Sequence, residues 1–155
     1  MSIDDKLANY ADEGNILGVI LMLDMGADVH ANYDRALRFA SMKGHVEVVK
    51  LLLENGANVH AHKDEALRWA SCDGHTEVVK LLLEHGADVH AVDDNALCYA
   101  SEYGHKDVIK LLLESGADVH ADNAWALRIA SYNGHTDVVN LLKEYKNKGE
   151  HSERN

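Results

Sequence analysis

The sequence predicts an all-α solenoid of about five stacked helix–turn–helix units. Two markers recur in phase every 30 residues. The phrase "GADVHA" or "GANVHA" begins at Gly26, Gly56, Gly86 and Gly116, and "GH" begins at Gly44, Gly74, Gly104 and Gly134. A period of this length indicates repeats that bury their apolar faces against one another.

The first helix of a unit is expected over residues 64–72, "DEALRWASC". Asp64 would act as its N-cap, with the carboxylate accepting a hydrogen bond from a free backbone N–H of the same helix. Asp4, Asp34 and Asp94 occupy the same column, whereas the last unit has Ala124 there. Gly74 would then end this helix.

The second helix is expected over residues 76–85, "TEVVKLLLEH". Val78, Val79 and Leu82 fall at helical spacing on one side. Gly86 supplies the left-handed residue that commonly ends a helix. Because helices this short are marginal in water by themselves, we expect stacking between units to stabilise them.

The predicted array covers residues 1–145 and has distinct ends. Lys143 and Lys146 stand where inner units carry Leu and Gly, which is typical of a capping repeat that faces water. The polar segment 146–155 is expected to be disordered. The units are an N-terminal cap at 1–30, internal repeats at 31–60, 61–90 and 91–120, and a C-terminal cap at 121–145.

Composition narrows the function. The net charge of −11 argues against nucleic acid as a partner. The N-terminus lacks the pattern of a secretory signal, and the longest apolar run, 16–23, is too short to span a membrane. With two cysteines, Cys72 and Cys98, reduced thiols and a cytoplasmic location are the simpler expectation.

No catalytic or cofactor motif is visible, so we expect neither an enzyme nor a cofactor. Histidines recur in two columns, beginning at His30 and at His45. Equivalent residues in adjacent units lie roughly 8–10 Å apart, which is too far to share one metal ion. Hydrogen bonding within turns is the favoured role.

The stretch "GHTEVVKLLLEHGADVHA" at 74–91 resembles the second helix and following turn of the ankyrin repeat, and the resemblance covers residues 3 to about 145. It implies protein–protein recognition without catalysis or cofactor. The units are 30 residues long, against about 33 in the family, and "RALR", "EALR", "NALC" and "WALR" stand where the family carries Thr-Pro-Leu-His. We therefore expect a shortened or absent β-hairpin finger. The 30-residue form resembles ankyrin repeats abundant in giant viruses of amoebae, which would place the protein in a host cytoplasm.

Helical geometry divides "ALRWAS" at 66–71 into two faces. At 100° per residue, Ala70 and Ser71 fall beside Leu67, while Arg68 and Trp69 fall on the opposite side. In an ankyrin-like stack this opposite side would line a concave groove that binds a partner protein. The predicted groove comprises Arg35, Arg38, Phe39, Met42, Glu65, Arg68, Trp69, Cys72, Asn95, Tyr99, Glu102, Trp125, Arg128 and Tyr132, in columns that also include Cys98 and Ile129, with Tyr33, Lys63, Asp93 and Asn123 at the rim.

Two interpretations of this surface stay open. A mixture of Trp, Tyr and Arg is typical of binding hot spots. Alternatively, the aromatic residues fill gaps between units and each Arg pairs with a neighbouring turn Asp. The protein would then be a structural or consensus-like repeat protein without a dedicated partner, natural or engineered.

The second helix of the first unit presents apolar residues in columns that are mostly polar elsewhere. Ile16, Leu17 and Ile20 stand where later units mostly carry Thr, Glu or Lys. They form a candidate self-association patch, unless Met1 and Ile3 fold over it. We expect a monomer, with weak homo-oligomerisation as the alternative.

Overall fold

The structure, a computed structural model, describes residues 1–152 and the side chains of residues 1–149. All regular secondary structure in the described part is α-helix, with no strand, and no helix in it is both long and apolar enough to cross a membrane. The helices are α1 (Ile3–Asp12), α2 (Ile16–Asp24), α3 (Ala31–Lys43), α4 (Val46–Glu54), α5 (Ala61–Cys72), α6 (Thr76–Glu84), α7 (Ala91–Tyr103), α8 (Lys106–Glu114), α9 (Ala121–Tyr132) and α10 (Thr136–Ser152).

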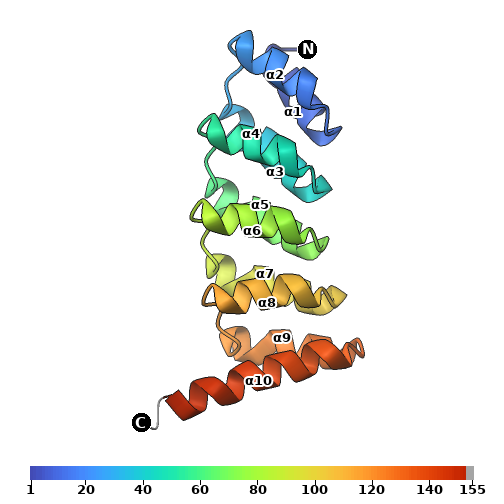
Figure 1. Cartoon of the computed structure of the whole chain (residues 1–155), viewed down its shortest axis with the longest axis vertical. Helices are drawn as coiled ribbons and strands as arrows, with labels where there is room; N and C mark the ends of the chain where they lie inside the picture. Colours follow the sequence, from blue (N-terminus) through green and yellow to red (C-terminus); the bar gives the residue numbers. More distant parts are fainter. Residues whose placement is uncertain (153–155) are drawn as a thin grey trace.

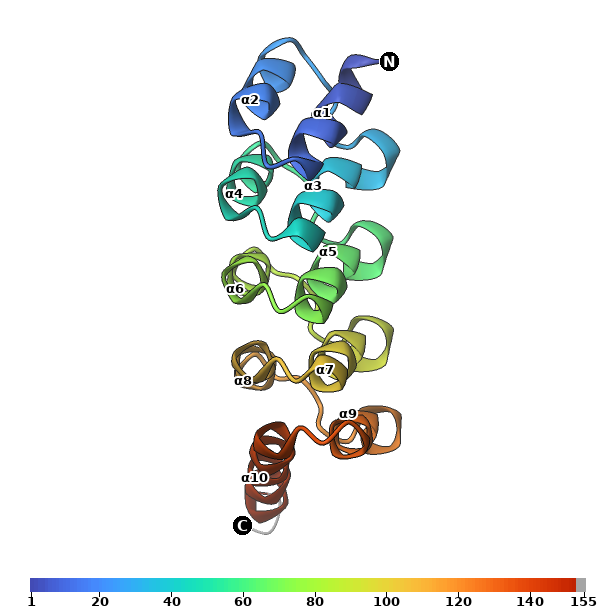
Figure 2. The same ribbon diagram turned by 90° about the vertical axis from the view of Figure 1, so that its right-hand side faces the viewer.

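The ten described helices stack in antiparallel pairs as one elongated array (Figure 1). Odd-numbered helices form one layer and even-numbered helices form the other (Figure 2). Successive odd helices make more extensive contact with each other than successive even helices do. The predicted all-α solenoid is therefore confirmed.

Apolar columns form one continuous core between the two layers. Leu67 of α5 and Val79 and Leu82 of α6 are fully buried, as are their counterparts one unit before and after. Burying one such aliphatic side chain contributes about 1.5–3 kcal/mol. Because each unit supplies only a few of them, stability depends on the neighbouring units.

Each first helix from α3 onward begins with a short left-handed turn, which the sequence did not predict. In α5 the residues His62, Lys63 and Asp64 have φ of 52°, 59° and 54°. The same three positions are left-handed in α3, α7 and α9. No Gly occupies any of them, although this conformation costs roughly 1 kcal/mol for other residues. These turns stand in place of a β-hairpin finger.

The prediction that Asp64 caps its own helix is wrong. Its φ lies in the left-handed region, and its N–H donates to the carbonyl oxygen of His60 at 3.3 Å. The right-handed part of α5 starts after Asp64, but the Asp64 carboxylate bonds to His60 and to the backbone N–H of Asp88 instead of to an N–H of that helix.

Second helices end much as predicted. α6 ends at Glu84, one residue before the expected end, and Gly86 follows with φ of 88°. Gly26, Gly56 and Gly116 are left-handed in the same way.

The C-terminal helix is longer than predicted. α10 continues to Ser152, so residues 146–152 are helical where a disordered tail was expected, and 153–155 lie outside the described residues. Tyr145 packs against the core, and Lys148 lies 2.6 Å from Glu144 one turn earlier. Lys146 replaces the Gly that ends the inner helices, so nothing stops the helix there.

Candidate protein-binding face

Buried aspartates join each unit to the next at the loop edge. Asp64 is buried, with 4% of its residue surface exposed. Its carboxylate accepts a hydrogen bond from the backbone N–H of Asp88 at 2.8 Å. Asp34 accepts from Asn58 at 2.6 Å, and Asp94 accepts from Asp118 at 2.8 Å. We call these contacts the junction bonds. They explain why the Asp column recurs: each carboxylate satisfies an N–H of the following loop.

Both histidine columns take part in hydrogen bonds at the turns, as predicted. His60 Nδ1 lies 3.1 Å from Asp64 Oδ1, in the turn that leads into α5. In the other column, His75 Nε2 lies 2.9 Å from the carbonyl oxygen of Met42 in the preceding unit, and His105 repeats this contact with Cys72. Within the described residues, no three His, Cys, Asp or Glu side chains gather as a metal site would require.

The predicted groove residues lie on the outward side of the first helices, which we call the first-helix face. It is defined by the fourteen predicted groove residues, Arg35 to Tyr132, together with Ile129. Trp69 is 37% exposed and Tyr99 is half-buried, and their rings stack with centroids 6.2 Å apart. These aromatic side chains therefore pack between units and also stay partly accessible to a partner, so both interpretations of this face hold for them.

Arginines on this face hold the left-handed turns. Arg68 donates from Nε to the carbonyl oxygen of Lys63 at 3.1 Å and from Nη2 to that of His62 at 3.0 Å. Arg38 bonds the corresponding two carbonyl oxygens in α3. The idea that each Arg pairs with a turn Asp is therefore wrong for these two. Both arginines bond carbonyl oxygens of the turn, and the turn Asp bonds the following loop instead.

Arg38 also forms a salt bridge with Glu65 of the next unit. Burial raises the pKa of the Glu65 carboxyl, but hydrogen bonds from Arg38 and Trp69 outweigh this effect, so the pKa lies below its ordinary value. Glu65 is therefore an anion at neutral pH, and Arg38 has its full set of partners. Near the N-terminus, Arg35 lies 4.0 Å from Asp5 and 4.8 Å from the centre of the Phe39 ring.

The last unit opens the face into a hollow. Trp125, Arg128, Ile129 and Tyr132 surround a cavity of about 400 Å³ on α9. The Arg128 guanidinium lies 5.3 Å from the centre of the Trp125 ring, and Tyr132 is 87% exposed. Arg128 and Tyr132 are exposed here, whereas the corresponding Arg68 and Cys72 of an inner unit are half-buried.

A family model described as "Ankyrin repeats (3 copies)" matches residues 7–93 and 90–153. Together the two matches span nearly the whole chain. The chain belongs to the ankyrin repeat family. Ankyrin repeats are generally protein–protein interaction modules, and the family is generally non-catalytic. A comparison with curated proteins found no significant match to the chain.

The remaining predicted residues differ in accessibility within the ankyrin stack. Met42, Cys72 and Glu102 are half-buried, and the rim residues Tyr33, Lys63, Asp93 and Asn123 are exposed. Cys98, in the same column as the arginines, is buried. Burial raises the pKa of the Cys72 and Cys98 thiols to about 11, so both are protonated and unreactive at neutral pH.

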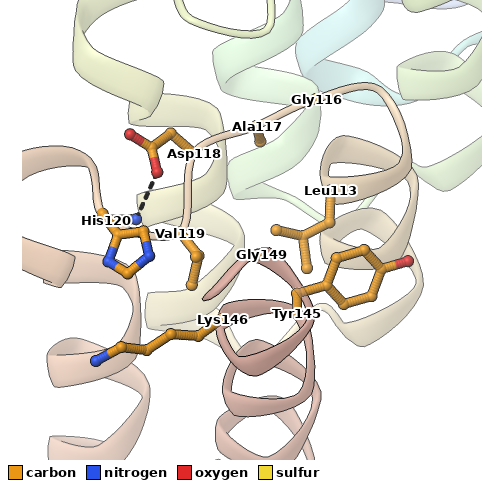
Figure 3. Close-up of a pocket in the computed structure, with 9 residues that line it drawn as sticks. All are labelled: Leu113, Gly116, Ala117, Asp118, Val119, His120, Tyr145, Lys146 and Gly149. Atoms are coloured by element: carbon orange, nitrogen blue, oxygen red, sulfur yellow. Dashed lines mark hydrogen bonds between the residues drawn. The ribbon is translucent and has the colours of Figure 1, made fainter. Parts of the chain in front are cut away.

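Another hollow lies away from the first-helix face, between the loop that follows α8 and the extended part of α10 (Figure 3). Its volume is about 340 Å³. The Lys146 side chain runs along its edge, and Asp118 turns away from it to accept the backbone N–H of His120 at 2.8 Å. This hollow exists because α10 continues straight where inner ankyrin units turn at a Gly. It contains none of the predicted site residues.

The apolar patch on α2 is uncovered and larger than predicted. Leu17 is 75% exposed, and Ile16 and Ile20 are exposed beside it. Met1 does not cover them: it is 80% exposed and lies 3.1 Å from Asn9 on α1. Leu21 and Met25 are also exposed. Sequence reasoning missed Leu21 because its column is apolar in every unit, and its counterparts Leu51, Leu81 and Leu111 are half-buried.

Proposed function

We propose that this ankyrin repeat protein is a non-catalytic module that binds a partner protein through the first-helix face. One observation carries the proposal: Trp69, Tyr99, Trp125 and Tyr132 remain accessible on a rigid scaffold, in columns where the residue type changes from unit to unit. Large aromatic residues flanked by arginine dominate binding hot spots because they bury much area at low entropic cost. The junction bonds keep the scaffold constant while this face varies.

Capture of partners with altered faces tests the proposal. We expect Trp69→Ala with Trp125→Ala to reduce recovery of bound proteins at least tenfold, since hot-spot truncations typically cost more than 1–2 kcal/mol each. Glu77→Ala with Lys80→Ala, on the exposed side of α6, is the matched control and should capture as the wild type does. Equal recovery of every protein by the aromatic double variant would contradict the proposal.

Self-association through α2 is a second candidate function, favoured by the exposure of five neighbouring apolar side chains. Together they present on the order of 500 Å² of apolar surface, comparable with the largest patches on monomeric proteins. Pairing two copies would bury about 1,000 Å², near the lower limit for a specific interface. We expect light scattering to show a concentration-dependent mass that Leu17→Glu with Ile20→Lys abolishes. A mass that is monomeric at all concentrations would exclude this candidate.

A further inference from the structure

The arginine column of the first-helix face differs from unit to unit in how many of its hydrogen bonds the chain itself supplies. This difference deepens the proposed function, on which the inference below rests. It indicates what chemistry a partner must bring.

In Arg38, all three guanidinium nitrogens make hydrogen bonds within the chain. Nε donates to the carbonyl oxygen of Tyr33 at 2.9 Å, and Nη2 donates to that of Asn32 at 2.9 Å. Nη1 bonds the carboxylate of Glu65, which comes from the next unit. This guanidinium has little left to offer a partner.

Arg68 repeats the first two contacts and lacks the third. Nε and Nη2 hold the turn carbonyls of Lys63 and His62. The residue 30 positions after Glu65 is Asn95, a neutral amide. Its Oδ1 is buried without a hydrogen bond. Among residues whose side chains are described, no carboxylate lies within ion-pair distance of Arg68, so Nη1 is available in a fixed orientation.

Arg128 is freer still. No hydrogen bond or carboxylate contact from the described side chains engages it, and its guanidinium lies over Trp125 beside the 400 Å³ cavity. An Arg held against an aromatic ring keeps its edge donors for a carboxylate. In a chain with a net charge of −11, two uncompensated guanidinium groups on one face favour an acidic ligand.

We propose that the first-helix face binds an extended, acidic segment of a partner protein, with one carboxylate on Arg68 and a second on Arg128. The two arginines are two units apart, or about 16–20 Å at 8–10 Å per packed helix. An extended chain advances about 3.3 Å per residue, so the two acidic residues are separated by about five or six positions. An apolar side chain near the second carboxylate fits the cavity formed by Trp125, Ile129 and Tyr132.

Binding of defined peptides to the full chain tests this inference. The probes are fluorescein-labelled ten-residue peptides with two Glu residues five or six positions apart and Leu beside the second Glu. Matched peptides carry Gln or Lys in place of both Glu, and a further set covers this chain's own sequence. Fluorescence anisotropy gives the dissociation constants. We expect the Glu peptides to bind at least tenfold more tightly than the Gln peptides and the Lys peptides to bind more weakly still.

Asn95→Glu is the decisive variant because it recreates the Arg38–Glu65 arrangement around Arg68. We expect it to weaken binding of the Glu peptide about tenfold while leaving the thermal midpoint unchanged or higher. Asn95→Gln introduces a side chain of the same size as Glu without its charge, and this variant should bind as the wild type does. Arg128→Gln should also lose about tenfold in affinity. A weaker peptide affinity without loss of stability separates a recognition role from a structural one.

The inference is overturned if Asn95→Glu binds the Glu peptide as tightly as the wild type, or if no Glu peptide exceeds its Gln counterpart. It is also overturned if this chain's own segments bind best, because the occupant is then a second copy. If neutral or basic peptides bind best and their binding requires Trp69, the inference of an acidic ligand is overturned, but the proposed function is not. The proposed function itself fails only if the aromatic double variant captures every partner as the wild type does.

Discussion

The loop edge and the first-helix face of this ankyrin stack follow opposite rules. At the loop edge, Asp34, Asp64 and Asp94 make the same bond to the next unit. On the first-helix face, the third contact of the arginine is a carboxylate at Arg38 and absent at Arg68. The Asp residues repeat because every junction uses the same bond, whereas the residue that could complete the arginine changes from Glu65 to Asn95.

The last unit supports this distinction. Ala124 occupies the Asp column in the last described unit, where the residue 24 positions later, Lys148, lies within α10 and not in a loop. Among the described units, Asp occurs where the residue 24 positions later lies in a loop and donates to it, and it is missing where that residue lies in a helix. The residue is therefore explained by the junction and not by the helix on which it lies.

The largest effect is expected from breaking a junction. Asp64→Ala would leave the N–H of Asp88 without its acceptor and remove the contact to His60. The loss of a buried, charge-assisted hydrogen bond should cost about 2–3 kcal/mol, measured by urea unfolding. The reverse substitution, Ala124→Asp, is the matched control and should change stability by less than about 0.5 kcal/mol. Equal effects at both positions would contradict the role assigned to the junction.

A smaller effect is expected from the second contact between units. His75→Ala removes the bond to the Met42 carbonyl and the ring that packs over Gly44, where an added Cβ would lie 2.5 Å from the imidazole. We expect a loss of about 1–2 kcal/mol. His85→Ala, exposed and bonded only within its own helix, should be close to neutral. A larger loss at His85 than at His75 would refute this assignment.

The left-handed turns allow a stabilising change. Val92 is β-branched, exposed and held at φ of 54°, a conformation that Gly adopts without steric cost. We expect Val92→Gly to raise the free energy of unfolding by about 1 kcal/mol. Asn32→Gly at the equivalent position should gain less, because Asn tolerates this region better. A loss of stability at Val92 would show that the turn is not strained.

Sequence reasoning reached the fold because the period and the apolar columns are local patterns. The 30-residue register, the second helices and their Gly ends follow from residue spacing alone. The left-handed turns do not, since His62, Lys63 and Asp64 show no Gly signal and are held by Arg68, whose role appears only in three dimensions. The Asp column was noticed but assigned to its own helix, because the partner N–H lies 24 residues away in the next loop.

The candidate face was only partly predictable for a similar reason. A helical wheel places Arg38, Arg68 and Arg128 on one side, but it cannot show that two of them are tied to backbone carbonyls. Nor can it show that Glu65 gives Arg38 a third hydrogen-bond partner, whereas Asn95 gives Arg68 none. Whether a residue on this face is free to bind a partner depends on its contacts with the neighbouring unit, and aligned repeat columns alone do not show those contacts.

The smallest expected effect is a pH dependence at the loop edge where the third unit meets the fourth. The pKa of His90 is raised above its ordinary value. Its hydrogen bond with Asp94 has the largest effect, burial opposes it, and the charges of Asp94, Asp88 and Asp118 raise the pKa further. A raised pKa in the folded state means that protonation stabilises the fold. This contribution is fully present below the unfolded value of about 6.5 and is lost as pH rises through the folded value.

We therefore expect the stability difference between the wild type and His90→Gln to be larger at pH 6 than at pH 8.5, as measured by urea unfolding at both pH values. Asp88→Asn refines the test, because Asn58 already accepts the backbone N–H of His60 in the preceding unit, so the amide preserves the turn and removes only charge. NMR titration of this variant should show the pKa of His90 closer to its ordinary value. If the pKa stays unchanged, the charge of Asp88 has no part in the shift, which then comes from Asp94 and Asp118.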